Sequence, residues 1–209
     1  MARTFTLVVL LVIVALFALS YMVSMGYIPA SSLALSAAPP VVHSSSGHGI
    51  AAPVGSSMAS SSILGPPSLS VAFLNRVLAA YHSPAMGLGS VLYQDSVTFG
   101  IDDAYPLAFF LHESSMGNNG VAAVTHSLGN IRCTPGWSCY SGYRSYATWV
   151  AGFLDWFHLI SSEYLPRHLS TVVSIIPVYA PSADHNDEYA YITAVLSAVS
   201  SWHAGRVLV

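Results

Sequence analysis

Glu113 is the residue whose neighbours in the sequence most clearly suggest chemistry. It closely follows an uncharged apolar run, residues 107–111 (LAFFL), and ends the helix that this run predicts. A carboxyl at the edge of such a helix is partly removed from water, and desolvation raises its pKa. Glycoside hydrolysis needs a protonated carboxyl of this kind to protonate the leaving oxygen. The alternative is a glutamate that forms a salt bridge at a helix end.

Several short motifs follow Glu113 in a fixed order and cover roughly residues 70–205. They are HESSMG at 112–117, THSLGNIR at 125–132, YRSYAT at 143–148, Asp155-Trp156, Tyr179-Ala180-Pro181 and the tyrosines at 189 and 191. Together they resemble the glucosaminidase family of peptidoglycan hydrolases (glycoside hydrolase family 73), a branch of the lysozyme-like superfamily. The family patterns are E-S-x-x-G, N-N-x-F-G-I-K, F-R-x-Y-x-S and a closing Y-A…Y region.

The resemblance implies a mainly α, lysozyme-like helical domain over residues 69–209, with a small irregular or β lobe. It implies an endo-β-N-acetylglucosaminidase that acts on peptidoglycan as a monomer and needs no cofactor. Glu113 matches the general acid, and Tyr146 matches a cleft tyrosine implicated in catalysis. The residues that would bind substrate are His126, Ser127, Gly129, Asn130 and Tyr143. The structural alternative for His126 is a helix cap. For Tyr143 and Tyr146 it is simple packing of the rings.

The sequence departs from the family pattern at two points. Gly129-Asn130 replaces the aromatic–glycine pair, so no aromatic ring is available there for sugar stacking. No Asp or Glu lies between Glu113 and Asp155, although an inverting mechanism uses a second carboxylate about 6.5–9.5 Å from the acid. Asp155, Asp102, Asp103 and the acidic cluster at 184–188 are the remaining candidates. The acetamido group of the substrate could also assist.

Two other functions compete with the glucosaminidase. A lytic transglycosylase acts on the same glycan with one acidic residue, but the chain lacks the G-L-M-Q segment typical of such enzymes. A non-catalytic module that binds cell-wall glycan would explain the two departures. The presence of both Glu113 and Tyr146 counts against that module.

The N-terminal third predicts export. Residues 7–25 form an uncharged apolar stretch near the roughly 20 residues that span a membrane, with Arg3 before it. Residues 1–26 are therefore a membrane anchor or a signal peptide, with a passable cleavage site before Ala37. Residues 27–68 are rich in Ser, Ala, Pro and Gly and predict a flexible linker. Either reading places the domain outside the cytoplasm, tethered to the membrane or secreted.

The remaining observations concern disulfides, metals and nucleic acid. Outside the cytoplasm Cys133 and Cys139 can form a disulfide, which we favour over two free thiols. Two thiols alone do not make a zinc site, and the sequence 184–188 (DHNDE) is typical of a loop followed by a helix cap rather than of a metal site. Only 7% of residues are charged and the net charge is -3, so nucleic acid is not an expected partner.

The hydrophobic periodicity and the breakers predict the helices of the domain. The first begins at Ser68 or Ser70 and carries Leu74 and Leu78 inward, and the last is capped by Asn186. A small hairpin is expected near the cysteines, within an irregular segment at 127–146. The expected helices span residues 70–78, 104–113, 121–125, 148–162, 170–178 and 187–203.

Overall fold

The computed structural model describes residues 61–209. The expected anchor at 1–26 and the linker up to residue 60 lie outside the described residues. Among residues 61–209, no helix combines the length and the apolar character needed to cross a membrane.

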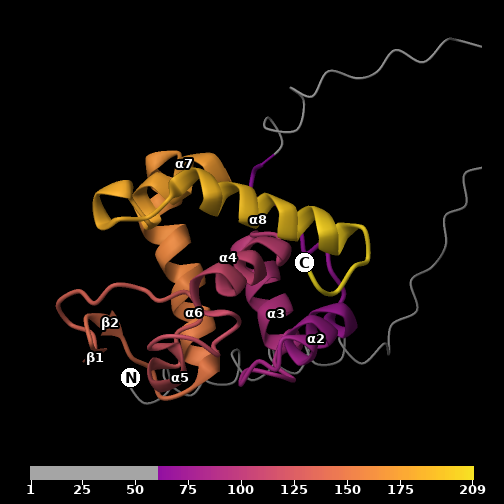
Figure 1. Cartoon of the computed structure of the whole chain (residues 1–209), viewed down its shortest axis with the longest axis horizontal. Helices are drawn as coiled ribbons and strands as arrows, with labels where there is room; N and C mark the ends of the chain where they lie inside the picture. Colours follow the sequence, from indigo (N-terminus) through magenta and orange to yellow (C-terminus); the bar gives the residue numbers. More distant parts are fainter. Residues whose placement is uncertain (1–60) are drawn as a thin grey trace, which may run out of the picture. The chain divides into compact units, whose positions relative to one another are not determined.

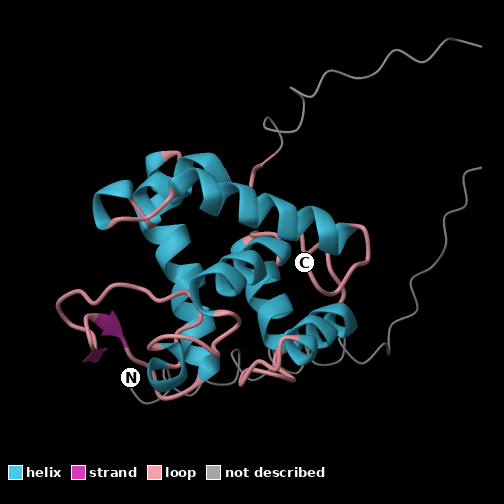
Figure 2. Ribbon diagram, viewed as in Figure 1, coloured by secondary structure: helices cyan, strands magenta, loops and turns pink. Residues whose placement is uncertain are grey.

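The described region is mainly helical, as the sequence predicts (Figure 2). Its seven α-helices are α2 (Val71–Ala80), α3 (Gly89–Phe99), α4 (Ala104–Ser114), α5 (Ala122–Thr125), α6 (Trp149–Leu159), α7 (Val172–Tyr179) and α8 (Glu188–His203). α6 continues as a π-helical turn, Ile160–Tyr164, and a short 3-10 turn follows at Leu165–Arg167. Another 3-10 turn, Ser182–Asp184, lies between α7 and α8.

α4 is the central helix, and the others surround it (Figure 1). Residues 104–110 are all buried, because the run between Ala104 and Phe110 has no polar face to turn toward water. α8 packs along α4, α2 packs against α3, and α6 packs against α3. Phe110 stacks on Phe153 and meets the edge of Trp156, both from α6. The helix that carries Glu113 is therefore surrounded by the core on most of its sides.

The only sheet among residues 61–209 is the expected hairpin near the cysteines. β1 (Cys139–Tyr140) pairs antiparallel with β2 (Tyr143–Arg144), with Cys139 opposite Arg144. Cys133 and Cys139 form the expected disulfide. We call the irregular region from 126 to 146 the lobe.

Three details differ from the sequence expectations. Residues 61–68, assigned to the linker, are packed: Ile63 is fully buried, and Asp103 accepts hydrogen bonds from the backbone N–H groups of Ser68 and Leu69, 3.0 Å each. α3 was not expected. The cap of α8 is Asp187 rather than Asn186, because the Asp187 carboxylate accepts from the N–H of Ala190 at 2.9 Å.

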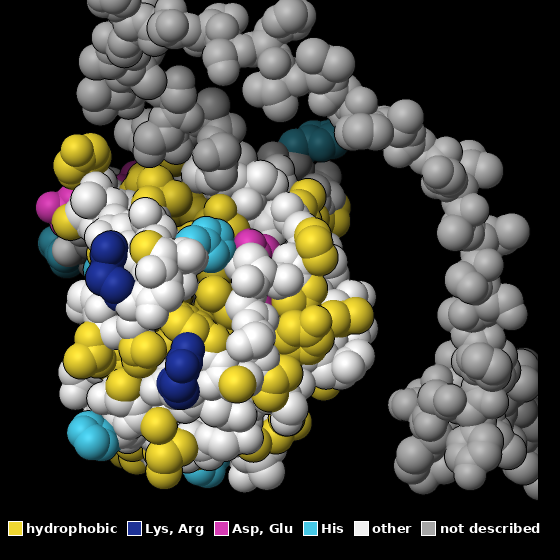
Figure 3. All heavy atoms as spheres, turned by 90° about the vertical axis from the view of Figure 1, so that its right-hand side faces the viewer, with side chains coloured by type: hydrophobic (Ala, Val, Ile, Leu, Met, Phe, Trp, Pro, Cys, Tyr) yellow, Lys and Arg dark blue, Asp and Glu magenta, His cyan; other side chains and the backbone are white. Residues whose placement is uncertain are grey.

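The surface carries few charges, in keeping with the composition. On the face that Figure 3 shows, apolar side chains are interspersed with uncharged polar surface, and charged side chains are scattered singly. No strongly basic or acidic face is visible in this view.

Candidate active site

Glu113 lies one residue before the end of α4, where the helix leaves the core. Ser115 follows in the left-handed conformation that ends the helix. The hydroxyl of Ser114 donates to the carbonyl oxygen of Leu128 at 2.8 Å, and the side-chain amide of Asn130 donates to the carbonyl of Glu113 at 2.7 Å. The end of α4 is therefore fixed to the lobe by one side chain of the helix and one side chain of the lobe.

The carboxylate of Glu113 is held by a tyrosine of the last helix. The phenolic hydroxyl of Tyr191 donates to Oε1 of Glu113 at 2.7 Å. The Tyr191 ring is buried, stacked on His112 with centroids 3.7 Å apart and tilted against Phe109. This packing leaves the hydroxyl little freedom, so it orients the carboxyl.

Burial raises the pKa of Glu113 above its usual range, and the hydrogen bond from Tyr191 and the side-chain amide of Asn130 beside it oppose the rise. The net direction is upward, which keeps a larger fraction of the carboxyl protonated near neutral pH. A general acid needs this property.

Glu113 opens into a cavity of about 160 Å³ between the lobe and the segment that joins α7 to α8. Polar and charged side chains dominate its wall. The lining residues are Glu113, Asn130, Arg132, Tyr143, Tyr179, Ala180, Asp184 and Asn186. The cavity thus joins the end of α4 to two segments that lie far apart in the sequence.

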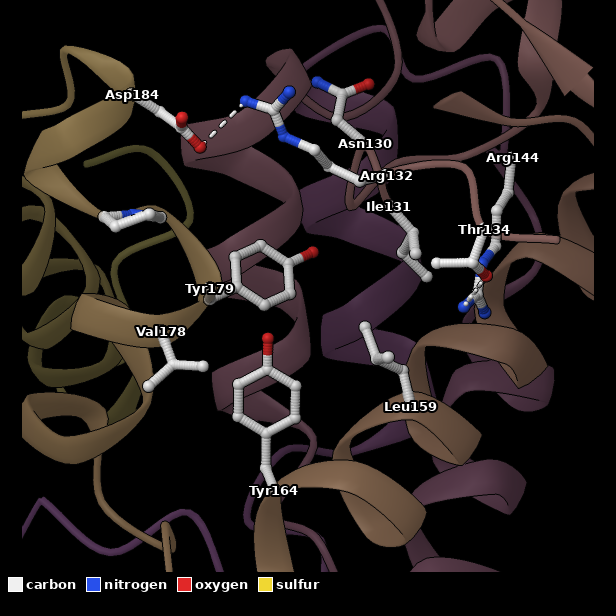
Figure 4. Close-up of a pocket in the computed structure, with 11 residues that line it drawn as sticks. Asn130, Ile131, Arg132, Thr134, Arg144, Leu159, Tyr164, Val178, Tyr179 and Asp184 are labelled. Atoms are coloured by element: carbon white, nitrogen blue, oxygen red, sulfur yellow. Dashed lines mark hydrogen bonds and ion pairs between the residues drawn. The ribbon is translucent and has the colours of Figure 1, made fainter. Parts of the chain in front are cut away.

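A second cavity of about 290 Å³ shares Asn130, Arg132, Tyr179 and Asp184 with the first. Figure 4 shows it between the lobe and the end of α7, with Tyr164 and Leu159 below and the Arg132–Asp184 ion pair across the top. Because the two cavities share four residues, they form neighbouring parts of one groove.

A buried ionic network holds the lobe in place. The Arg144 guanidinium contacts both carboxylate oxygens of Asp155, at 3.2 and 2.9 Å, and also donates to Thr134 Oγ1 at 3.0 Å. Tyr146 donates to Asp155 Oδ2 at 2.5 Å. The guanidinium also lies over the ring of Trp137, 4.3 Å from its centroid. The hairpin and the disulfide loop are therefore anchored to α6.

Gly129 is required by close packing in the turn of the lobe. A Cβ there would lie 2.6 Å from Trp156 Cδ1 and 2.8 Å from the Tyr179 hydroxyl. That hydroxyl donates to the carbonyl oxygen of Gly129. The glycine thus allows α6 and α7 to approach the chain just before Asn130.

The structure brings together some of the residues expected from the sequence. Glu113, Asn130 and Tyr143 line the same cavity. Gly129 does not line that cavity, and its close neighbours are Trp156 and Tyr179. The other expected residues contact groups of the lobe and of α6.

His126, Ser127 and Tyr146 lie within the lobe and are not among the residues that line the Glu113 cavity. His126 is the C-cap of α5, and its Nδ1 is 2.8 Å from the carbonyl of Tyr146. The Ser127 side chain is buried, and its hydroxyl accepts from the N–H of Ile131. The Tyr146 hydroxyl is engaged by Asp155.

The sequence reasoning did not single out the roles of Tyr191, Tyr179 and Arg132. The closing motif contains Tyr191 but does not indicate its contact with Glu113. Its position on the inward stripe of α8, four residues before Val195, is a signal that it faces the core near the end of α4. No local pattern pairs Arg132 with Asp184, because 52 residues separate them.

No protein-family model matches the chain, and no match is found among curated proteins.

Proposed function

We propose that the protein is an exported, membrane-tethered hydrolase of peptidoglycan that cleaves glycosidic bonds at N-acetylglucosamine. The observation that carries this proposal is the carboxyl of Glu113, whose pKa is raised by burial and which faces a polar cavity at the end of the central helix. A carboxyl in this setting is suited to protonate the oxygen of a glycosidic bond. The ordered motifs between residues 112 and 191 support the same activity by their resemblance to the glucosaminidases.

The arrangement of the domain supports a lysozyme-like architecture, which we include in the proposal. A buried central helix ends in the acid, and a small disulfide-bonded lobe and the α7–α8 segment form the two walls of the groove. In this proposal the apolar N-terminal stretch anchors the protein, and the domain acts on glycan outside the cytoplasm. A disulfide is compatible with that compartment.

The test is digestion of purified peptidoglycan by the full chain in mild detergent, with the products identified by mass spectrometry. Glu113→Gln removes the acid and keeps the shape, and Glu163→Gln is the matched control, because Glu163 is exposed and lies outside the cavity. We expect fragments with a reducing N-acetylglucosamine end from the wild-type chain and the control. Glu113→Gln should release at least about 100-fold less, since general acid catalysis contributes roughly 10²–10⁴-fold.

Each other outcome points to a different function. Products with 1,6-anhydro ends would replace the hydrolase by a lytic transglycosylase. A folded wild-type chain that binds peptidoglycan and releases nothing would indicate a glycan-binding module. Equal release by the wild-type chain and Glu113→Gln would remove Glu113 from the chemistry.

A further inference from the structure

We propose that Asp184 is the second catalytic carboxylate, the base that activates the hydrolytic water opposite Glu113. This inference rests on the proposed glycosidase activity and assigns the inverting mechanism to it. The starting point is that the sequence offers no acid in the lobe, between Glu113 and Asp155.

Asp184 lines the same cavity as Glu113, from a different segment of the chain. It ends the 3-10 turn Ser182–Asp184, in the segment that joins α7 to α8, and both carboxylates line the space of about 160 Å³. One water occupies about 30 Å³ in the liquid, so the cavity that both carboxylates line has room for a water. The segment that joins α7 to α8 therefore supplies the second carboxylate, which the lobe lacks.

The other acids near the site are engaged elsewhere. Asp155 is buried with a guanidinium on both oxygens and a tyrosine hydroxyl on Oδ2, and it does not line the Glu113 cavity. Asp102 and Asp103 precede α4, whereas Glu113 lies near its far end, about 15 Å away at 1.5 Å per residue. None of these three lines the cavity into which Glu113 opens.

The two acids that follow Asp184 in the chain are also used in the scaffold. Asp187 caps α8 through the N–H of Ala190, and Glu188 accepts from the N–H of Ser182 at 2.6 Å. The second contact ties the start of α8 back to the turn that carries Asp184. Asp187 and Glu188 therefore hold the segment, and Asp184 is the acid that it presents to the cavity.

Arg132 positions Asp184 from the lobe. Its Nη2 lies 3.0 Å from Asp184 Oδ2, with the two side chains 67% and 42% exposed. Figure 4 shows this ion pair reaching across the groove beside Asn130. Because the pair is open to solvent, a ligand or water can reach the carboxylate without unfolding the segment.

The reaction then balances with these two groups and one water. The Glu113 carboxylic acid gives its proton to the glycosidic oxygen, and the C1–O bond breaks with its electron pair on that oxygen. The water oxygen forms a bond to C1 from the opposite face, and its proton passes to Asp184. The products are an alcohol and a hemiacetal of inverted configuration, and exchange with solvent returns the two carboxyls to their starting states.

The test compares Asp184→Asn with Arg132→Gln in the full chain, by turnover of peptidoglycan and by the anomer first released, followed by NMR. Arg132→Gln breaks the same ion pair and leaves the carboxylate in place. We expect Asp184→Asn to lower kcat at least about 100-fold and Arg132→Gln to lower it less than about tenfold. The first product of the wild-type chain should be the α-anomer. Azide should restore turnover to Asp184→Ala and give an α-glycosyl azide.

Three results would overturn the assignment. Equal losses in Asp184→Asn and Arg132→Gln would show that only the ion pair matters. A β-anomer as first product would indicate participation by the acetamido group. Full activity of Asp184→Asn, with activity lost in Glu113→Gln, would refute this inference alone, whereas a folded wild-type chain that cleaves no glycan would refute the proposed function together with it.

Discussion

Tyr191 donates a hydrogen bond from its hydroxyl to the carboxylate of Glu113, at 2.7 Å across 78 residues of sequence. The bond stabilises the ionised form of Glu113, so it partly opposes the effect of burial on the pKa of that carboxyl. The last helix thereby helps to set the protonation state of a group at the end of the central helix.

Replacing Tyr191 by Phe should move the alkaline limb of the pH–activity profile to higher pH. The change removes a donor to the carboxylate, so the pKa of Glu113 rises further, and the acid stays protonated over a wider range. The ring and its stacking on His112 are kept, and we therefore expect kcat at the optimum to fall less than about tenfold, since one hydrogen bond contributes about 1 kcal/mol.

The matched control is Tyr189→Phe, because Tyr189 lies on the same helix and is 73% exposed. The profile of this control should coincide with that of the wild type. An unmoved alkaline limb in Tyr191→Phe would show that the hydroxyl does not tune the catalytic acid.

Replacing Asp155 by Asn should destabilise the domain by about 3–5 kcal/mol, because it leaves the buried guanidinium of Arg144 without its charged partner. The exposed pair offers the comparison: Arg132→Gln should cost about 1 kcal/mol or less. Urea denaturation of both variants measures the difference. Similar midpoints for the two would contradict the structural role that we give to the buried pair.

Much of the helical architecture follows from the sequence, because caps and apolar stripes agree there. Ser70 accepts from the N–H of Phe73, Thr148 accepts from the N–H of Ala151, and the helices that follow them begin as expected. The hydrophobic periodicity does not predict α3. Its buried positions are Gly89, Leu92 and Ser96, so its inward face has too little apolar character to produce a periodic signal.

The candidate site was predictable only in part. A local motif identifies Glu113, because its apolar run and the residues after it stand together in the sequence. Asp184 was one of several acids in the sequence, and only the packing of the α7–α8 segment against the lobe brings it to the same cavity. The hydroxyl of Tyr146 fits a catalytic motif, yet its short hydrogen bond to Asp155 depends on how the lobe meets α6.

The domain should become more stable as the pH falls from about 7 toward 4. Burial raises the pKa of Asp103 to about 7 and that of Asp95 to about 6, from the usual value of 3.8. The folded state therefore binds more protons than the unfolded state between the usual value and these raised values. The stability that this contributes is fully present below pH 3.8 and is lost as the pH rises through 6 and 7.

Thermal unfolding at pH 5 and pH 8 measures this effect. We expect Tm to be higher at pH 5 by several degrees, given that about 1 kcal/mol shifts Tm by roughly 2–4 °C in domains of this size. Asp103→Asn keeps an oxygen that can accept from Ser68 and Leu69, so it should reduce the pH dependence without unfolding the segment. A Tm that is higher at pH 8 in the wild type would show that these carboxyls do not dominate.

Removing the disulfide should lower stability by about 2 kcal/mol, the value that loop closure over a short segment predicts. Cys133 and Cys139 are six residues apart and enclose Trp137, whose ring packs on Arg144. Replacing both cysteines by serine frees this loop, while Tyr191 keeps its hydrogen bond to Glu113 and Asp184 stays on the segment that joins α7 to α8. We therefore expect a lower urea midpoint with a loss of kcat below about tenfold. Reduction of the wild-type chain should give the same midpoint as the double variant, and a midpoint unchanged by either treatment would contradict a stabilising role for the bond.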